Sequence, residues 1–533
     1  TAAALALLFA AQFVATSEPA RAGVRPDEIS DNLTVVADGT QAILCSGGKF
    51  TNHGGDISFV DDKAIVLCGS DDEGIENDGF VVADISDPST PTEIGRFECV
   101  ASASDLAVWE DLVFLAVDRN GDSRGAHIGP YDPDDDGDPA TPDPLTDDCS
   151  APVASYYDAT KKKEDIFRGI RIVSIADPDR PQLVASIPLG ARGAHTVSVL
   201  PRGSRPAHGA APIDEVYLYA SSPTDRENWV LGVPLDDPAA AAGNVTTIDH
   251  GETWGCHDIS FFVPAGLAAC AAVGAARGDP AKPTEAHFER PIAGASLLDI
   301  RDDADDPNDD GAGPTSPKLV AVIDNPHPAA RLHSAAFSWD GKTLIFSDEN
   351  NTSTQAGFSC LPEETGGLSG GLWFYDISDS ARPKLVGYQE PHYLPGAGWC
   401  TSVNFNVIPL GSGRDVLVGA WYMGGTTVVD FSDPSDPREI AYFNAAPGDP
   451  EVGSLTRAAY WYDGLIYINN VHGCLTGIVC LGPTARGLDV LRLNDSGLDL
   501  SNAVGLGRFD MGLQECVPPL FGRDPDSWQC AAG

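Results

Sequence analysis

Short hydrophobic runs rich in β-branched and aromatic residues alternate along the chain with turns rich in aspartate, serine, glycine and proline. One phrase recurs: a glycine, a hydrophobic run, and then Asp-Ile-Ser-Asp-Pro or a close variant. Clear copies lie at residues 79–88, 169–178, 371–379 and 425–434, and weaker copies lie at 229–238, 295–302 and 487–495. The hydrophobic run favours a strand. Aspartate and serine favour the turn that follows, and proline cannot donate to a further ladder. Each phrase therefore predicts one strand and its end.

Two more hydrophobic segments precede each phrase, and a short one follows it. The first lies at residues 56–59, 105–108, 196–199, 258–261, 334–337, 402–405 and 457–460. The second lies at residues 64–68, 112–117, 215–220, 267–273, 343–347, 415–419 and 465–469. Repeated units of four short strands are typical of a β-propeller, and no segment has the period of a long amphipathic helix. We therefore predict an all-β fold, a single propeller of about seven four-stranded blades over residues 33–510.

Two segments compete to close the ring. A spare strand at residues 33–37 and the segment 503–510 both fit the missing outer strand of the last blade, and we favour residues 33–37. The long insertions fall between the second and third strands of their units, at residues 120–164, 274–291, 349–370 and 471–486. Insertions at one repeat position build one face, so we expect loops to cap the face where the first strands begin.

The recurring phrases resemble those of LVIVD-repeat proteins, and more narrowly those of secreted bacterial members of that group. Segments 255–259, 333–341, 420–425 and 459–464 carry the resemblance further, and together it covers about residues 45–495. The resemblance implies the propeller fold. It implies no particular activity, because propellers serve many unrelated functions.

Charge and targeting signals narrow the class of protein. The chain carries 78 acidic and 33 basic residues, a formal net charge of -45, which disfavours nucleic acid and anionic membranes as partners. An apolar run from Ala2 to Val14, followed by the small-x-small cleavage pattern in Pro19-Ala20-Arg21-Ala22, predicts a signal peptide over residues 1–22. It is too short for a comfortable membrane span. We expect a secreted, extracellular monomer without membrane insertion.

Twelve cysteines fit an oxidising compartment, since their number is even and no C-x-x-C pair suggests a zinc site. We expect the close pairs to be bridged: Cys256 with Cys270, Cys474 with Cys480, and Cys516 with Cys530. The last pair would make residues 511–533 a disulfide-containing tail.

Histidine recurs at one position of the repeat. The residue before the first strand is, unit by unit, Gly55, Ser104, His195, His257, His333, Thr401 and Thr456. The first strand of a propeller blade is innermost, so the three histidines should meet at the mouth of the central channel. Neutral imidazoles there would suit a Zn, Cu, Fe or Mn ion. Alternatively, they bond backbone carbonyls between blades or line a wet channel.

Three nearby side chains are candidates for proton transfer. They are Asp258, Tyr422 and His472, and Asp258 is also placed to orient a ligating histidine. His53 and Asp56 should lie near the same mouth.

A separate signal lies in the first long insertion. Asp132, Asp134 and Asp136 precede Gly137, with Asp143 at the twelfth position, and alternate carboxylates around a glycine turn can wrap Ca²⁺. The prolines around it exclude the flanking helices of an EF-hand. A solvated acidic loop is the alternative.

Two functions of different class fit these observations. The first is an extracellular binding module whose loop-capped channel mouth takes a protein, glycan or small-molecule ligand. The second is a metal-dependent enzyme, an oxidase, lyase or hydrolase, with the ion on His195, His257 and His333.

Overall fold

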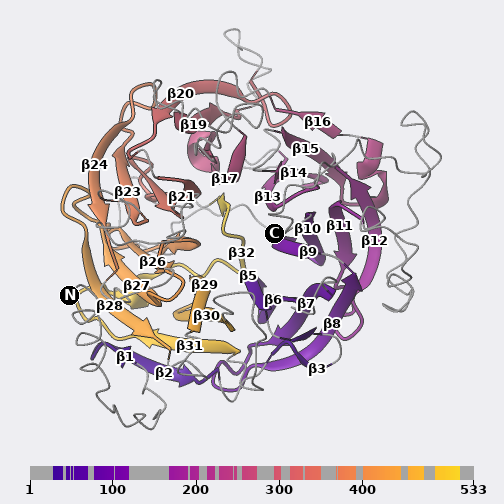
Figure 1. Ribbon diagram of the computed structural model, residues 1–533, viewed down its shortest axis with the longest axis horizontal. Helices are drawn as coiled ribbons and strands as arrows, with labels where there is room; N and C mark the ends of the chain where they lie inside the picture. Colours follow the sequence, from indigo (N-terminus) through magenta and orange to yellow (C-terminus); the bar gives the residue numbers. More distant parts are fainter. Residues whose placement is uncertain are drawn as a thin grey trace, which may run out of the picture.

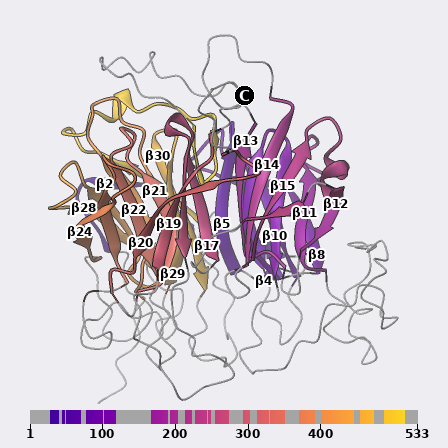
Figure 2. The same cartoon turned by 90° about the horizontal axis from the view of Figure 1, so that it is seen from above.

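A computed structural model of the chain shows a ring of seven antiparallel sheets around a central axis (Figure 1). It describes residues 28–39, 44–47, 50–51, 53–69, 77–100, 102–118, 167–189, 193–202, 213–222, 227–243, 245–248, 255–272, 293–301, 312–327, 330–349, 368, 370–391, 400–445, 454–472 and 487–515. The prediction of a seven-bladed propeller is confirmed. Figure 2 shows the strands running between the two faces of the disc.

The first four blades follow one another along the chain. Blade one contains β5 (His53–Val60), β6 (Lys63–Gly69), β7 (Asn77–Asp84) and β8 (Thr92–Val100). Blade two contains β9 (Ser102–Trp109), β10 (Leu112–Asp118), β11 (Gly169–Ser174) and β12 (Gln182–Pro188). Blade three contains β13 (Thr196–Pro201), β14 (Glu215–Ser222), β15 (Glu227–Pro234) and β16 (Val245–Thr247). Blade four contains β17 (Cys256–Phe262), β18 (Leu267–Ala272), β19 (Ala293–Asp299) and β20 (Lys318–Asp324).

The remaining blades complete the ring. Blade five contains β21 (Leu332–Phe337), β22 (Thr343–Asp348), β23 (Leu372–Asp376) and β24 (Lys384–Gln389). Blade six contains β25 (Phe405–Val407), β26 (Val416–Ala420), β27 (Thr426–Asp430) and β28 (Arg438–Asn444), with β1 (Glu28–Ile29) on its outer edge. Blade seven contains β29 (Ser454–Tyr462), β30 (Leu465–His472), β31 (Leu488–Leu493) and β2 (Leu33–Ala37).

Short elements lie between and beside the blades. They are the two-stranded sheet β3 (Ser46–Gly47) and β4 (Phe50–Thr51), and the 3₁₀ helices η2 (Pro238–Gly243), η3 (Val263–Ala265) and η4 (Leu500–Asn502). The described part of the chain contains no α-helix, as the missing helical period predicts. The first strand expected at residues 402–405 lies further along the chain, since β25 spans Phe405–Val407. The hydroxyl of Ser402 bonds Gly371 O instead, at 2.7 Å.

The N-terminal strand closes the ring. β2 pairs antiparallel with β31, with Leu33 opposite Leu493, and so supplies the outer strand of blade seven. Leu33 is buried in the core between blades six and seven, and Ala37 is buried in the core between blades seven and one. The favoured closure is therefore confirmed, and the alternative, that residues 503–510 complete this blade, is wrong.

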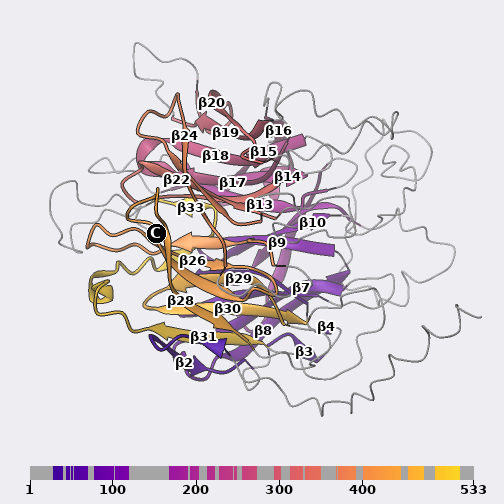
Figure 3. The same ribbon diagram turned by 60° about the vertical axis from the view of Figure 1, so that its left-hand side comes forward.

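The C-terminal segment instead runs through the channel. β32 (Arg508–Phe509) pairs with the inner strand β5 (Figure 1). β33 (Leu513–Gln514) lies parallel to the inner strand β17 (Figure 3). The side chain of Gln514 accepts from Phe337 N at 2.7 Å and donates to Phe337 O at 2.8 Å. All these contacts lie near the ends of inner strands, so residues 503–515 fill the channel at that face, which we call the plug face.

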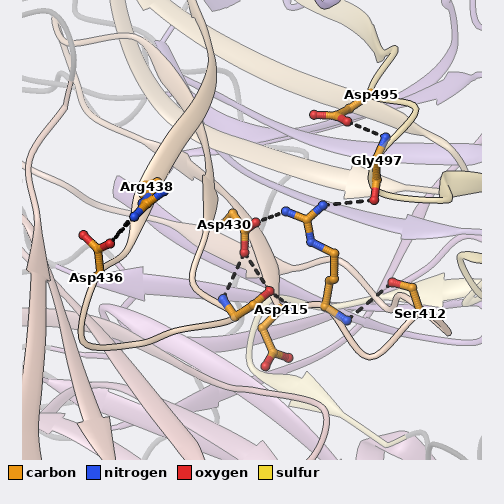
Figure 4. A network of polar contacts seen from close by, with 9 residues as sticks. Ser412, Asp415, Asp430, Asp436, Arg438, Asp495 and Gly497 are labelled. Atoms are coloured by element: carbon orange, nitrogen blue, oxygen red, sulfur yellow. Dashed lines mark hydrogen bonds and ion pairs between the residues drawn. The ribbon is translucent and has the colours of Figure 1, made fainter.

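The recurring phrase works as the residue chemistry predicts. In blade six, Asp430 accepts hydrogen bonds from the backbone N–H of Ser432 at 3.0 Å and from its hydroxyl at 2.7 Å. Asp433 forms the same pair of bonds with Ser435. The Arg414 guanidinium pairs with Asp430 and donates to Gly497 O at 2.9 Å, which joins blade six to the turn after β31 (Figure 4). Equivalent bonds hold the other copies, at Asp84 to Ser86, Asp87 to Ser89 and Asp376 to Ser378.

The turn of each phrase also packs against the preceding blade. A Cβ added to Gly387 in β24 would collide with the carbonyl oxygen of Pro434, in the turn of blade six. Gly95 in β8 has the same relation to Pro178 in blade two. Backbone therefore approaches backbone between neighbouring blades, and only glycine leaves the space.

The described cysteines are all disulfide-bonded. The expected bridge from Cys256 to Cys270 is confirmed, and a second bridge joins Cys45 to Cys68. Cys474, Cys480, Cys516 and Cys530 lie outside the described residues. Such bridges persist in oxidising compartments, which is compatible with an extracellular protein.

Within the described residues, no helix is long and apolar enough to span a membrane.

We predict that Gly387→Ala lowers the free energy of unfolding by about 1–3 kcal/mol, because the new methyl group meets backbone that cannot rotate away. Urea unfolding measures it. Gly313→Ala is the matched control, since its added Cβ meets nothing closer than 3.7 Å and should change stability by less than about 0.5 kcal/mol. Equal effects of the two changes would contradict the role of Gly387.

We predict that a chain starting at Asp38 loses at least about 3 kcal/mol of stability relative to one starting at Ser30, since both chains lack β1 and only the second keeps β2. The shorter chain lacks β2, so the buried Leu33 is lost and the edge of β31 is left unpaired. Urea unfolding and size-exclusion chromatography should show a less stable, self-associating protein. Identical behaviour of the two chains would exclude closure by β2.

Candidate functional site

The three histidines predicted from the repeat meet at the channel mouth. His195 directly precedes β13, and His257 and His333 are the second residues of β17 and β21. The ring centroids of His195 and His257 lie 4.9 Å apart, and those of His257 and His333 lie 4.0 Å apart. His257 is buried, and the other two are half-buried. We call this face, where the inner strands begin, the histidine face.

A β-bulge explains why His257 and His333 face the axis. The register of β17 with β18 shifts between Cys256 and Asp258, which leaves His257 as the extra residue. β21 shifts between Leu332 and Ala335, around His333. Related shifts occur at the starts of β5, β9 and β29. A bulge re-aims the side chain of the extra residue, so each of these blades offers one group at the mouth.

A carboxylate joins two of the histidines. His257, His333 and Glu349 each offer a ligand atom, and these atoms all lie within 4.8 Å of one another. Glu349 directly follows β22 and is buried, which places it on the histidine face because second strands end there. Apart from its place as the first residue of an insertion, no sequence pattern points to Glu349. His195 is outside this group of ligand atoms, although its ring contacts that of His257.

Tyr422 and Asp258 lie beside these three residues. The Tyr422 hydroxyl donates to Glu349 Oε1 at 2.8 Å, and Tyr422 has a left-handed backbone with φ of 45°. The Asp258 carboxyl hydrogen-bonds Ser334, whose hydroxyl lies 2.7 Å from His333 Nδ1. Tyr422 therefore contacts the ligand candidate Glu349 directly, and Asp258 contacts Ser334, which in turn contacts the ligand candidate His333. β30 ends at His472 on the same face. The side chains of His472 and His53 are not among those that the structure describes.

Burial and neighbouring charges determine the protonation states of His257, His333 and Glu349. Burial lowers the pKa of His333 to about 4. Burial, with the neighbouring His333 and His195, lowers the pKa of His257 well below its usual value. Burial acts to raise the pKa of Glu349, but His333, Arg331 and the Tyr422 hydroxyl outweigh it, and the net pKa is lowered. The buried His257 Nδ1 has no hydrogen-bond partner. Near pH 7 the group is two neutral imidazoles and one carboxylate.

A second cluster lies in the channel between the histidine face and the plug. It contains the buried carboxyls of Asp56, Asp105, Asp258 and Asp510, from β5, β9, β17 and the C-terminal segment. Burial raises the pKa of Asp56 to about 6 and that of Asp258 to about 7. Burial and the neighbouring carboxyls raise those of Asp105 and Asp510 well above the ordinary value. The Tyr460 hydroxyl donates to Asp56. These carboxyls share protons near neutral pH.

The connections that carry the long insertions leave and return at the histidine face, after second strands and before third strands. The insertions themselves, including Asp132, Asp134, Asp136 and Asp143, lie outside the described residues. The calcium loop therefore stays a prediction.

We predict that Asp56→Asn stabilises the protein at pH 8 by about 2–3 kcal/mol. The raised pKa means that the folded protein keeps a proton that the unfolded chain releases above about pH 4. This stability is complete below pH 3.8 and is lost as pH rises through about 6. An amide keeps the contacts without titrating, so urea unfolding in EDTA should show the gain at pH 8 and little at pH 4.

The exposed Asp84 gives the opposite sign. Its pKa is lowered by hydrogen bonds from Ser86, so Asp84→Asn should lose stability at pH 8 rather than gain it. A gain in both variants, or in neither, would contradict the assignment of shared protons to the aspartate cluster.

Comparison with known protein families identifies the repeat. The model of the LVIVD repeat matches residues 74–99 and 420–445, which contain the phrases of blades one and six. No curated protein sequence matches the chain significantly.

Three solved structures match the chain at low identity and low TM-score. A periplasmic gluconolactonase of Pseudomonas aeruginosa, PpgL, is 9% identical with a TM-score of 0.41, covering 72% of this chain and 84% of that one. Sqt1 from Chaetomium thermophilum is 11% identical with a TM-score of 0.40, covering 87% and 90%. The Cps50 (Swd1) propeller domain from Myceliophteria thermophila is 7% identical with a TM-score of 0.41, covering 84% and 98%. At these values the likeness carries no argument about function.

Proposed function

We propose that this LVIVD-repeat propeller is a metal-dependent enzyme whose ion is held by His257, His333 and Glu349 at the channel mouth. The observation that carries the proposal is the meeting of these three ligand atoms within 4.8 Å of one another. They come from blades four and five, so the ring itself assembles the site. The ligand set predicted from sequence is thereby revised: Glu349 takes the place of His195.

The donor set suits a divalent transition metal. Two imidazoles and one carboxylate are the ligands of catalytic zinc in several hydrolases and of non-haem iron in oxygenases. Metal ligands must be deprotonated, and burial already holds both histidines neutral while the carboxylate stays ionised. The unpartnered His257 Nδ1 is a buried nitrogen that a metal ion would satisfy.

Three protein ligands leave a coordination position open, as catalytic sites do and structural zinc sites do not. A bound ion would there lower the pKa of a water molecule or polarise a substrate oxygen. The chain's own groups prepare the site around it. Tyr422 holds Glu349 Oε1, and Ser334 holds His333 Nδ1, which fixes the orientation of two ligands. His195 touches the His257 ring from outside the ligand group and is the candidate for proton transfer at the open position.

We predict that protein purified without a histidine tag, and then loaded with Zn²⁺, Mn²⁺, Fe²⁺ or Cu²⁺, binds one equivalent of ion per chain at this site. His257→Ala should abolish this binding. Tyr422→Phe, which loses one outer contact, should weaken it about 10–100-fold. Elemental analysis and competition with a chelator measure both. His327→Ala, a histidine outside the ligand group, is the control and should bind as the parent does.

The open position is tested on the Co²⁺ form, where added azide should change the visible absorption spectrum. Full occupancy without any response to azide would indicate a structural ion rather than an enzyme. If none of the metals binds stoichiometrically, the metal centre is wrong, and the binding module with an extracellular ligand is the remaining hypothesis.

A further inference from the structure

Two arginines stand at the same mouth as the ligand group. Arg331 directly precedes β21, and Arg457 is the extra residue of the bulge in β29, where Thr456 pairs with Asn470 and Ala458 pairs with Asn469. Arg457 thus occupies in blade seven the position that His257 occupies in blade four. In a chain with 78 acidic and 33 basic residues, two guanidinium groups at one channel mouth indicate a specific role.

Neither arginine is fully partnered. The Nε atoms of Arg331 and Arg457 are both buried without a hydrogen-bond partner. Arg331 Nη1 lies 3.7 Å from Glu349 Oε2, beyond hydrogen-bond distance. By contrast, Arg96 and Arg438 bond carboxylates directly at the surface. A buried donor left unpartnered costs about 1–3 kcal/mol, so these two nitrogens call for an acceptor that the described chain does not supply.

The positive charges of Arg331 and Arg457 both act electrostatically on His333 and Tyr422. Burial is the largest cause of the lowered pKa of His333, and Arg331 and Arg457 lower it further. Burial and Glu349 raise the pKa of the Tyr422 hydroxyl, while Arg457 and Arg331 act in the opposite direction. Arg331 and Arg457 thus place two guanidinium groups beside the one carboxylate of the ligand group, Glu349. An anion is the ligand that such a site attracts.

We propose that the channel mouth binds a small molecule through a carboxylate or phosphate group, held by Arg331 and Arg457 next to the metal position. The proposal deepens the proposed function, because it names the class of substrate that the metal site would act on. A planar guanidinium presents its N–H groups in a fork that matches two oxygens of such an anion. An anion in this place satisfies both orphaned Nε atoms and approaches the open coordination position of the ion.

The test is calorimetric titration of inorganic phosphate and, separately, acetate into the full chain, both in EDTA and after Zn²⁺ loading. We expect at least one anion to bind the metal-free protein with a Kd below about 10 mM, and the tighter of the two identifies the headgroup. Arg457→Gln should weaken that binding at least 10-fold, with Zn²⁺ content unchanged. Arg457→Lys, which keeps the charge but loses the fork, should fall between the two.

Arg438→Gln is the matched control, because Arg438 is an exposed arginine of blade six that pairs with Asp436. It should bind the anion as the parent does. Binding of neither anion, or equal affinity of the parent and Arg457→Gln, overturns the proposal. Equal losses in Arg457→Gln and Arg438→Gln also overturn it, since they would show a general effect of charge.

The two proposals fail separately. Anion binding that depends on Arg457, in a protein that takes up no metal, supports the anion site and removes the metal centre. Metal binding with no anion response removes the anion site and leaves the metal centre. Circular dichroism of each variant confirms that the propeller is folded.

Discussion

A propeller has a central channel only if its last blade is joined to its first. Here the joint is the pairing of β2 with β31, made by residues that lie more than 450 positions apart in the chain. Leu33 packs in the core between blades six and seven, and Ala37 packs in the core between blades seven and one, so both stabilise the joint. Closure keeps seven inner strands around one axis, and side chains at the starts of those strands then face one another. The candidate site depends on this pairing.

The bulges place different functional side chains at equivalent positions of different blades. A repeat fold places one residue from each blade at an equivalent point, and the bulge aims that residue at the axis. Because each blade is free to differ at that point, blade four gives an imidazole at His257, blade five an imidazole at His333 and blade seven a guanidinium at Arg457. Glu349, from the end of a second strand, adds the carboxylate. The bulges thus supply two kinds of side chain, imidazole and guanidinium, to a mouth where Glu349 adds the carboxylate.

Burial then decides which of these groups carry charge. The same loss of water that lowers the pKa of His257 and His333 raises the pKa of Asp56 and Asp258. The result is a layered channel. Neutral nitrogen donors, an ionised Glu349 and two guanidinium groups lie at the mouth, and carboxyls that share protons lie beneath them. The C-terminal segment completes the lower layer by adding Asp510 and fills the opposite end.

The sequence by itself determined the strands, their grouping by four, the points where insertions attach, the bridge from Cys256 to Cys270 and the convergence of three histidines. These follow from signals within a few residues or from the repeat register, and both can be read along the chain. Only the tertiary structure decided that Glu349 replaces His195 in the ligand group, that Arg457 rather than Thr456 faces the axis, and that residues 503–515 enter the channel. Each of these rests on a one-residue bulge or on a contact between distant blades. Neither leaves a local pattern, because the energy that fixes it comes from packing across the closed ring.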